Sequence, residues 1–261
     1  MTSSHDTPSG DTTPVYQRIA NDLRALIKSG QYAPGVALPS ERKLMERYNV
    51  ARMTVREALA ELRTEGLIRS EPGAGVFVRE RPMLLRISGP ERFSRADRER
   101  GQAAFAADMA RLNRRWTPDV IDVSRVPADD EIASYLRVEP GTMVVRRYRV
   151  FSVEGHRQQI ATSYIPLDLA EGTPIEQENP GPGGTYARLE ERGHTIDSYR
   201  EDITARMPTR AERDTLQLDG DGIPVFRVVR FAIGTTGRVL EITDTLLPAD
   251  RHLLSYPWQA T

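Results

Sequence analysis

The chain has 261 residues, of which 39% are hydrophobic and 28% charged, and it contains no cysteine. This length suits a protein of two domains, and the lack of cysteine excludes disulfides, thiolate metal sites and cysteine nucleophiles. No window approaches the ~18 consecutive apolar residues of a membrane span. Residues 1–13 are polar and lack the apolar segment of a signal peptide, so we expect a disordered tail there and a cytoplasmic protein with no membrane contact.

Positive charge is concentrated toward the N-terminus, although the net charge of the whole chain is only -1. Residues 14–81 hold 12 Lys+Arg against 8 Asp+Glu, a balance of +4, whereas residues 82–261 hold 24 against 27, a balance of -3. Binding to phosphates requires such a local basic excess. The distribution favours nucleic-acid contact by the N-terminal part.

Residues 14–79 carry the pattern of a winged helix-turn-helix. Apolar residues at helical spacing predict a first helix, and a second helix begins after Ser40, which is a good N-cap residue. A third helix is predicted from about residue 51 to residue 66. Two short strands follow and are joined around Pro72-Gly73-Ala74-Gly75. Helix, turn, recognition helix and wing in this order indicate binding to duplex DNA.

The candidate DNA contacts lie at the start of the third helix, because a recognition helix enters the major groove by its N-terminal end. Arg52 is the better candidate for a bidentate contact to guanine, while Thr54 and Arg56 fit a phosphate equally well. Ser40 and Arg42 begin the preceding helix and should meet the DNA backbone. The wing glycines, Gly73 and Gly75, allow a close approach to the minor groove or to a phosphate.

Several motifs of this module resemble the DNA-binding domain of the GntR family of bacterial repressors. They are Tyr16-Gln17-Arg18-Ile19-Ala20, Leu38-Pro39-Ser40-Glu41-Arg42, Thr54-Val55-Arg56-Glu57-Ala58-Leu59, Glu65-Gly66-Leu67-Ile68 and Gly73-Ala74-Gly75-Val76-Phe77-Val78. The resemblance implies a homodimer on a palindromic double-stranded operator. It also implies operator contacts from Arg42, Ala51, Arg52, Thr54, Arg56 and Gly73.

Two residues depart from the family pattern. Ala51 stands where the family often has Ser or Thr, so a capping hydroxyl and a phosphate contact are lost at that position. Met53 places a bulky apolar side chain on the groove side, where it can touch a thymine methyl.

The rest of the chain is predicted to be an α+β domain over residues 92–258, after a linker at residues 80–91. A helix is expected around residues 103–112. Two strand pairs follow, 144–151 with 160–165 and 225–231 with 239–247, and both end on a proline. Strand pairs with interspersed helices favour an antiparallel sheet covered by helices.

Five motifs of this part resemble the UTRA effector-binding domain, which marks the HutC subfamily of the GntR family. They are Val145-Arg146-Arg147-Tyr148-Arg149, Ser163-Tyr164-Ile165-Pro166, Leu189-Glu190-Glu191-Arg192-Gly193, residues 224–230 and Gly237-Arg238-Val239-Leu240-Glu241. The resemblance implies a fold like that of chorismate lyase, used for ligand sensing and dimerisation without catalysis.

Arg147 and Arg149 are the first candidates for effector binding. They lie two residues apart in a predicted strand, so they project to the same face about 7 Å apart. Two guanidinium groups there can clamp an anion; a solvated face with cross-strand ion pairs fits the spacing equally well. The resemblance favours the clamp, because subfamily members use an Arg-x-Arg pair at this place.

Further effector candidates are less specific. Arg92 and Ser94 match a loop that binds phosphate in sugar-phosphate sensors, or they lie in an ordinary surface loop. Glu241 fits either a contact to ligand hydroxyls or an amine, or an exposed sheet carboxylate. Thr185 and Tyr186 follow a glycine-rich loop and could line the same cavity. This chain has Gln159 and Ala161 where relatives often carry an acid.

The sequence contains no nucleophile, nucleotide-binding or metal-ligand motif, and its four histidines form no ligand pattern. We therefore expect no enzyme, no metal and no cofactor. The predicted function is that of a ligand-responsive DNA-binding transcriptional regulator, a repressor released from a palindromic operator by a small anionic metabolite such as a phosphorylated sugar or another anion. The alternative is a DNA-binding regulator whose C-terminal domain only dimerises and senses no ligand.

Overall fold

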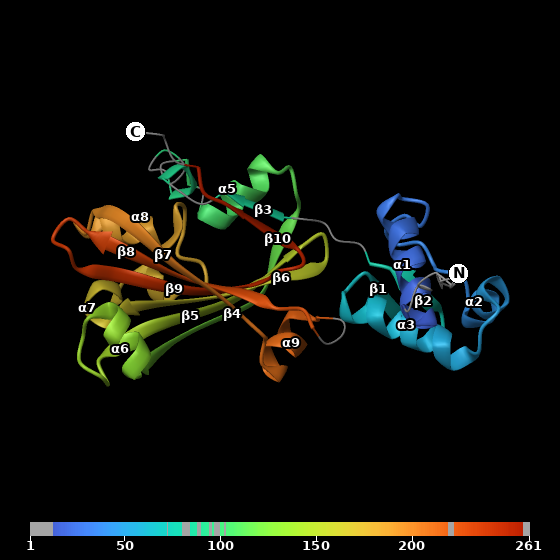
Figure 1. Cartoon of the computed structure of the whole chain (residues 1–261). Helices are drawn as coiled ribbons and strands as arrows, with labels where there is room; N and C mark the ends of the chain where they lie inside the picture. The colour runs from blue at the N-terminus through green and yellow to red at the C-terminus, as the bar shows by residue number, and fades with distance from the viewer. Residues whose placement is uncertain are drawn as a thin grey trace, which may run out of the picture. The chain divides into compact units, whose positions relative to one another are not determined.

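The structure is a computed structural model that describes residues 13–71, 73–79, 84–87, 90–93, 96, 100–101, 103–218 and 222–257. The chain divides into two compact units, with the main boundary between residues 81 and 82. Figure 1 shows the helical N-terminal unit and the sheet of the C-terminal unit. None of the helices in the described ranges is long and apolar enough to cross a membrane.

The N-terminal unit contains three helices followed by a two-stranded antiparallel sheet. Its elements are α1 (Val15–Lys28), α2 (Glu41–Tyr48), α3 (Arg52–Thr64), β1 (Ile68–Glu71) and β2 (Gly75–Val78). This is the predicted order of a winged helix-turn-helix. The core is formed by the apolar faces of the three helices and both strands, with Leu23, Leu44, Val55, Leu62 and Ile68 fully buried.

Local signals explain how α2 and α3 begin and end. The side chain of Ser40 accepts a hydrogen bond from the Lys43 backbone N–H, which confirms Ser40 as the N-cap of α2. Asn49 ends α2 in a left-handed conformation with φ 51°, a backbone position that Asn tolerates well. Ala51 precedes α3 and makes no side-chain cap. The turn between α2 and α3 is therefore short and well defined.

The C-terminal unit is built on a six-stranded antiparallel sheet of order β4-β5-β6-β9-β8-β7. Its strands are β4 (Trp116–Pro127), β5 (Met143–Val153), β6 (His156–Pro166), β7 (Ile196–Arg206), β8 (Val225–Gly234) and β9 (Val239–Pro248). The two predicted strand pairs are the hairpins β5–β6 and β8–β9, which occupy the centre. The edge strands β4 and β7 complete the sheet.

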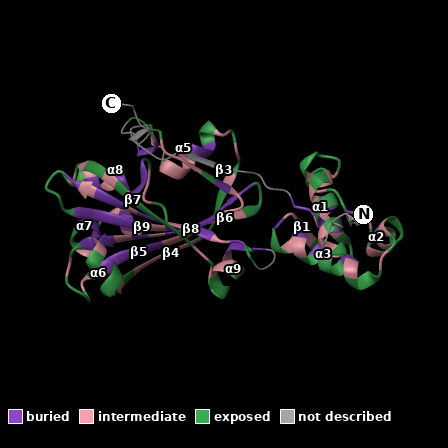
Figure 2. Cartoon of the chain, in the orientation of Figure 1, coloured by how far each residue is buried: buried purple, intermediate pink, exposed green. Residues whose placement is uncertain are grey.

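Helices and short turns cover both faces of this sheet. They are η1 (Pro90–Phe93), α5 (Ala104–Arg111), α6 (Asp130–Leu136), α7 (Leu167–Ala170), η2 (Pro174–Glu176), α8 (Gly184–Glu191) and α9 (Arg210–Leu216). Val145 and Ile165 pack with α7, α8 and η1 on one face, whereas their neighbours Val144 and Ile242 pack with α6 on the other. Figure 2 shows that buried residues follow the central strands, as expected for a sheet covered on both faces.

One short segment differs from the prediction. Residues 84–87, within the predicted linker at 80–91, form β3 (Leu84–Ile87), which pairs in parallel with β10 (His252–Ser255). The run Leu84-Leu85-Arg86-Ile87 has no turn residue, and a strand from the far end of the sequence supplies its backbone partners. Pairing over such a distance leaves no local signal, so the prediction of a linker is wrong for these four residues.

The packing of α3 leads to a first prediction. Leu59 is 2% exposed in the core of the N-terminal unit, whereas Met53 on the same helix is 63% exposed. Leu59→Ala should lower the free energy of unfolding of this unit by about 2–5 kcal/mol, because it leaves a cavity. Met53→Ala should change it by less than about 0.5 kcal/mol. Amide hydrogen exchange of α1 and α3 in the intact protein measures both values; equal effects would contradict the packing described here.

Candidate functional site

The exposed start of α3 presents two arginines that are held by one carboxylate. Glu41, the first residue of α2, accepts hydrogen bonds from Arg52 Nε at 2.7 Å and from Arg56 Nε at 3.2 Å. The hydrogen bond from Arg52, then that from Arg56, holds the pKa of Glu41 below its ordinary value. Within the described residues, no hydrogen bond occupies the Nη groups of either arginine. Both guanidinium groups are thus oriented by Glu41 while their outer edges stay open.

The other predicted DNA-binding residues lie around these arginines. Arg42 is exposed and lies 4.0 Å from Glu46, one turn further along α2. Met53 is exposed beside Arg52, and Thr54 is half-buried. Gly73 and Gly75 have φ values of 76° and 125°, which L side chains rarely adopt. Sequence reasoning missed the role of Glu41, since its helix precedes α3 and only the turn between them brings the three side chains together.

The C-terminal unit contains a cavity of about 140 Å³ on the face of the sheet covered by α5, α8 and η1. Side chains from β5, β6, β8 and β9 form its floor, since alternate residues of a strand share one face. The cavity brings together five of the predicted effector residues: Arg92, Arg149, Thr185, Tyr186 and Glu241. Ser94 lies outside the described residues. The cavity is therefore the candidate effector site.

Arg149 has hydrogen-bonding capacity that the protein does not use. Its Nη2 donates to Ser163 Oγ, and its Nε is buried without a partner. Burial lowers the pKa of Arg149; the charge of Glu241 raises it again in part, and that of Arg230 lowers it further. No carboxylate among the described residues lies within ion-pair distance of this guanidinium. A buried donor of a half-buried cation is stabilised by an acceptor, which a ligand anion would supply.

Arg230, which sequence reasoning missed, lines the same cavity from β8. Its Nε donates to Tyr186 Oη at 3.0 Å and its Nη2 to Thr243 Oγ1 at 3.1 Å. The guanidinium carbon also lies 4.5 Å from the centre of the Phe93 ring, a distance that allows a cation–π interaction. Arg230 is thus a second cation at the cavity, half-buried and fixed in position by its neighbours.

Two carboxylates balance part of this charge. Glu241 is 3% exposed and accepts a hydrogen bond from Thr243 Oγ1 at 3.0 Å. Asp108 of α5 binds Arg92 of η1, with 2.7 Å between Arg92 Nε and Asp108 Oδ2. Arg92 Nη1 remains buried without a partner. Arg149 and Arg230 against Glu241 therefore leave the cavity with an excess of positive charge.

Arg147 does not line this cavity, contrary to the prediction of a clamp formed with Arg149. It is 1% exposed, and its guanidinium donates to the backbone carbonyls of Ile175, Gln177 and Glu178. Burial first, and the nearby charge of Arg149 second, lower the pKa of Arg147 to about 10. Both arginines share one face of β5, but the segment 175–178 covers Arg147 and offers its carbonyl oxygens there.

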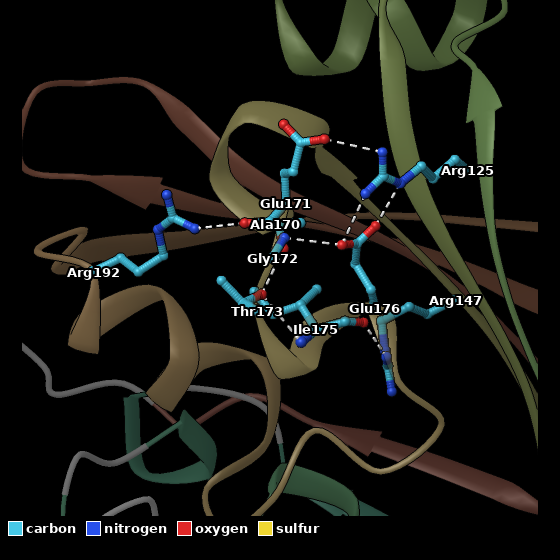
Figure 3. A network of polar contacts seen from close by, with 9 residues as sticks. All are labelled: Arg125, Arg147, Ala170, Glu171, Gly172, Thr173, Ile175, Glu176 and Arg192. Atoms are coloured by element: carbon cyan, nitrogen blue, oxygen red, sulfur yellow. Dashed lines mark hydrogen bonds and ion pairs between the residues drawn. The ribbon is translucent and has the colours of Figure 1, made fainter.

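Figure 3 shows that this segment is held from two sides. Arg147 reaches the carbonyl of Ile175, while Arg125 of β4 binds the carboxylate of Glu176 with Nε–Oε1 at 2.6 Å and also reaches Glu171 at 3.0 Å. The same stretch of chain continues to Gly183 and Gly184, which line the cavity. Arg147 therefore positions the wall of the cavity and does not face its interior.

Comparison with known proteins identifies both units. Residues 15–78 match the bacterial regulatory proteins of the gntR family, and residues 111–252 match the UTRA domain. An HTH-type transcriptional regulator of Streptomyces coelicolor is 32% identical over 94% of this chain and 93% of its own. The chain belongs to the GntR family. It is a DNA-binding transcriptional regulator, and the UTRA domain after the winged helix-turn-helix confirms the predicted α+β arrangement of the HutC type.

Other relatives of this GntR-family regulator support the same family assignment. The transcriptional repressor NagR of Bacillus subtilis is 27% identical over 92% of each chain. A solved GntR-family transcriptional regulator matches with a TM-score of 0.65 at 30% identity, covering 95% of this chain and 99% of its own. PhnF of Mycobacterium smegmatis matches with a TM-score of 0.58 at 22% identity, covering 93% and 100%, and shares the fold. NagR and the solved GntR-family protein are transcriptional regulators, and the chain belongs to a family of regulators and not of enzymes.

The different environments of the two arginines lead to a second prediction. Arg147→Ala should lower the free energy of unfolding of the C-terminal unit by about 3 kcal/mol, because it leaves buried carbonyls without donors. Arg149→Ala should cost less, since it removes a half-buried charge to which the described residues offer one hydrogen bond. Urea unfolding followed by tryptophan fluorescence reports on this unit, because both tryptophans, Trp116 and Trp258, follow residue 82. A larger loss for Arg149→Ala would reverse these roles.

Proposed function

We propose that this GntR-family regulator is a repressor that leaves a palindromic operator when a small anionic metabolite occupies the cavity of its UTRA domain. The supporting observation is Arg149, a half-buried cation whose buried Nε–H donor is unused, in a cavity of net positive charge. Names of relatives agree with repression: NagR is a repressor, and MngR of Escherichia coli, 26% identical over 92% of this chain, is the repressor of a mannosyl-D-glycerate transport and metabolism system.

On the DNA side, Arg52 is proposed to read a base, most simply guanine through O6 and N7. Arg56 and Thr54 bind the backbone or an adjacent base, and Met53 contacts a thymine methyl. The remaining residues position the module on the phosphates: Ser40, Arg42, Ala51, Gly73 and Gly75. Glu41 keeps Arg52 and Arg56 extended before DNA arrives.

A homodimer is part of this proposal. A single winged module buries too little surface for tight and specific binding, and a palindromic operator matches a two-fold symmetric protein. The C-terminal unit would then join two copies as well as bind the effector. Dimerisation alone, however, gives no reason for a guanidinium with a buried, unused Nε–H donor next to a cavity, so this observation favours a ligand sensor.

The effector can release DNA only if it binds the conformation that is unable to bind DNA more tightly than the competent one. A ligand anion that pairs with Arg149 contributes a free energy that depends on the exact arrangement of the cavity walls. The response is thus expected to depend on Arg149 and on the elements that close the cavity, η1 and α5.

A third prediction concerns DNA readout. Arg52→Ala should weaken operator binding by about 1–3 kcal/mol and relax the base preference at one symmetric position of each half-site. Arg42→Ala should weaken binding to all sequences alike and reduce the salt dependence by about one counterion. Both are measured by titrating operator and random DNA, after the operator has been selected from random fragments. Equal losses on both DNAs for Arg52→Ala would exclude base readout by this residue.

A fourth prediction tests the sensor. Arg149→Ala should bind the operator with unchanged affinity. It should no longer leave the DNA when the metabolites that release the wild-type protein are added, because the ligand anion has lost its partner. Release is measured by fluorescence anisotropy of labelled operator DNA. The control is Arg146→Ala, which removes a neighbouring, half-buried charge on the other face of the strand and should respond normally. Loss of DNA binding by Arg149→Ala would instead assign this residue a structural role.

A further inference from the structure

Three aromatic rings line the cavity close to Arg149. Phe105 of α5, Trp116 of β4 and Phe151 of β5 all border it. Their ring centres are 4.6 Å apart for Phe105 and Phe151, 5.4 Å for Phe105 and Trp116, and 5.8 Å for Trp116 and Phe151. The rings contact each other in stacked and edge-on orientations, so they form one continuous apolar wall.

This aromatic wall adjoins the half-buried Arg149. Phe151 and Arg149 are two residues apart on β5, so their side chains leave the same face about 7 Å apart along the strand. Gln159 of β6 pairs directly with Phe151 in the sheet and is 6% exposed. Within the described chain its carboxamide has no hydrogen-bond partner, and it borders the cavity. Apolar surface, a cation and an unused polar group thus meet within the length of one small ligand.

The charge of the cavity restricts the ligand further. Arg92 is paired with Asp108, so Arg149 and Arg230 against Glu241 leave one positive charge. A monoanion neutralises this excess. A dianionic phosphate would leave an uncompensated negative charge in a buried site, which is costly.

The aromatic wall also disfavours a ligand that carries many hydroxyl groups. Phenylalanine rings offer no hydrogen-bond partner, and an indole ring offers a single N–H donor. Sugar hydroxyls that face these rings would lose their hydrogen bonds to water without replacement. The volume of about 140 Å³ is close to that of an apolar cavity of about 150 Å³ that admits one benzene molecule.

We infer that the effector is an amphipathic organic monoanion, a carboxylate attached to one apolar ring or a short aliphatic chain, and not a phosphorylated sugar. This inference rests on the proposed function, because it takes the cavity to be the effector site. The carboxylate pairs with Arg149, the apolar part packs against Phe105, Trp116 and Phe151, and Gln159 binds a polar substituent or the carboxylate edge.

The test uses the fluorescence of Trp116 in the full chain. The protein has two tryptophans, so Trp258→Phe leaves Trp116 as the single emitter at the aromatic wall. Four probes are titrated: phenylacetate, hexanoate, phenylacetamide as the neutral control, and glucose-6-phosphate. The inference expects a saturable change with phenylacetate and hexanoate, and none with phenylacetamide or glucose-6-phosphate.

Two variants show whether the aromatic wall contributes to the binding of phenylacetate. Phe105→Leu keeps an apolar side chain but removes the ring, and it should weaken phenylacetate binding by about tenfold or more. Tyr135→Leu removes a ring that packs on Phe231, a residue that does not border the cavity, and it should leave the affinity unchanged. Circular dichroism of Phe105→Leu confirms that the variant is folded before its affinity is interpreted.

The outcomes separate this inference from the proposed function. Saturable binding of glucose-6-phosphate that requires Arg149 but is indifferent to Phe105→Leu would overturn the inference and leave the anion sensor intact. Absence of a saturable change with both carboxylates would overturn the inference whatever the phosphate does. Anion binding that persists unchanged in Arg149→Ala would overturn the proposed effector site itself.

Discussion

The structure of the C-terminal unit depends on which hydrogen-bond acceptors it gives to the arginine side chains on one face of its sheet. A guanidinium cannot lose its charge at neutral pH and carries five N–H donors, so its burial requires acceptors. The unit gives Arg147 three backbone carbonyls from the segment 175–178. Arg149, two residues further along β5, receives one side-chain hydroxyl. This difference divides the face into a part closed by the segment 175–178 and a part that lines the cavity.

Hydrogen bonds from arginines also hold the segments around the cavity in place. The carbonyls that satisfy Arg147 belong to a segment whose Ile175 packs into the core of the unit, and Arg125 secures the same segment through Glu176. The walls of the cavity are therefore positioned before any ligand arrives, which reduces the entropy lost on binding. In the N-terminal unit Glu41 plays a comparable part for Arg52 and Arg56, although there the arginines are exposed and the contact is screened by salt.

Most of the winged helix-turn-helix could be predicted from the sequence, because its helices have regular apolar spacing and its turns contain Ser40, Asn49 and glycines. The two central hairpins could also be predicted. The edge strands β4 and β7 could not, since exposed and half-buried positions alternate irregularly along them. Strand β3 was mistaken for linker because its partner β10 lies more than a hundred residues away, and no local pattern reports such a pairing.

The candidate effector site shows where sequence reasoning fails for a physical reason. Spacing places Arg147 and Arg149 on the same face, yet only the position of the segment 175–178 distinguishes a residue that binds carbonyls from one that faces a cavity. Arg230 and the aromatic wall come from β8, α5, β4 and β5. Their proximity is a property of the tertiary fold, so the apolar end of the cavity left no signature in the sequence.

The covalent path of the chain suggests how an occupied cavity acts on the DNA-binding unit. After β2 the chain runs through β3, which β10 holds in place, and then enters η1, whose Arg92 and Phe93 border the cavity. Arg92 connects η1 to α5 through Asp108, and α5 carries Phe105 of the aromatic wall. A ligand that contacts both Arg149 and Phe105 therefore changes the free energy of the elements that directly follow the DNA-binding unit in the chain. In the proposed sensor the coupling passes through η1 and its buried ion pair with α5, so a change in that pair should alter the response to ligand more than the affinity for DNA.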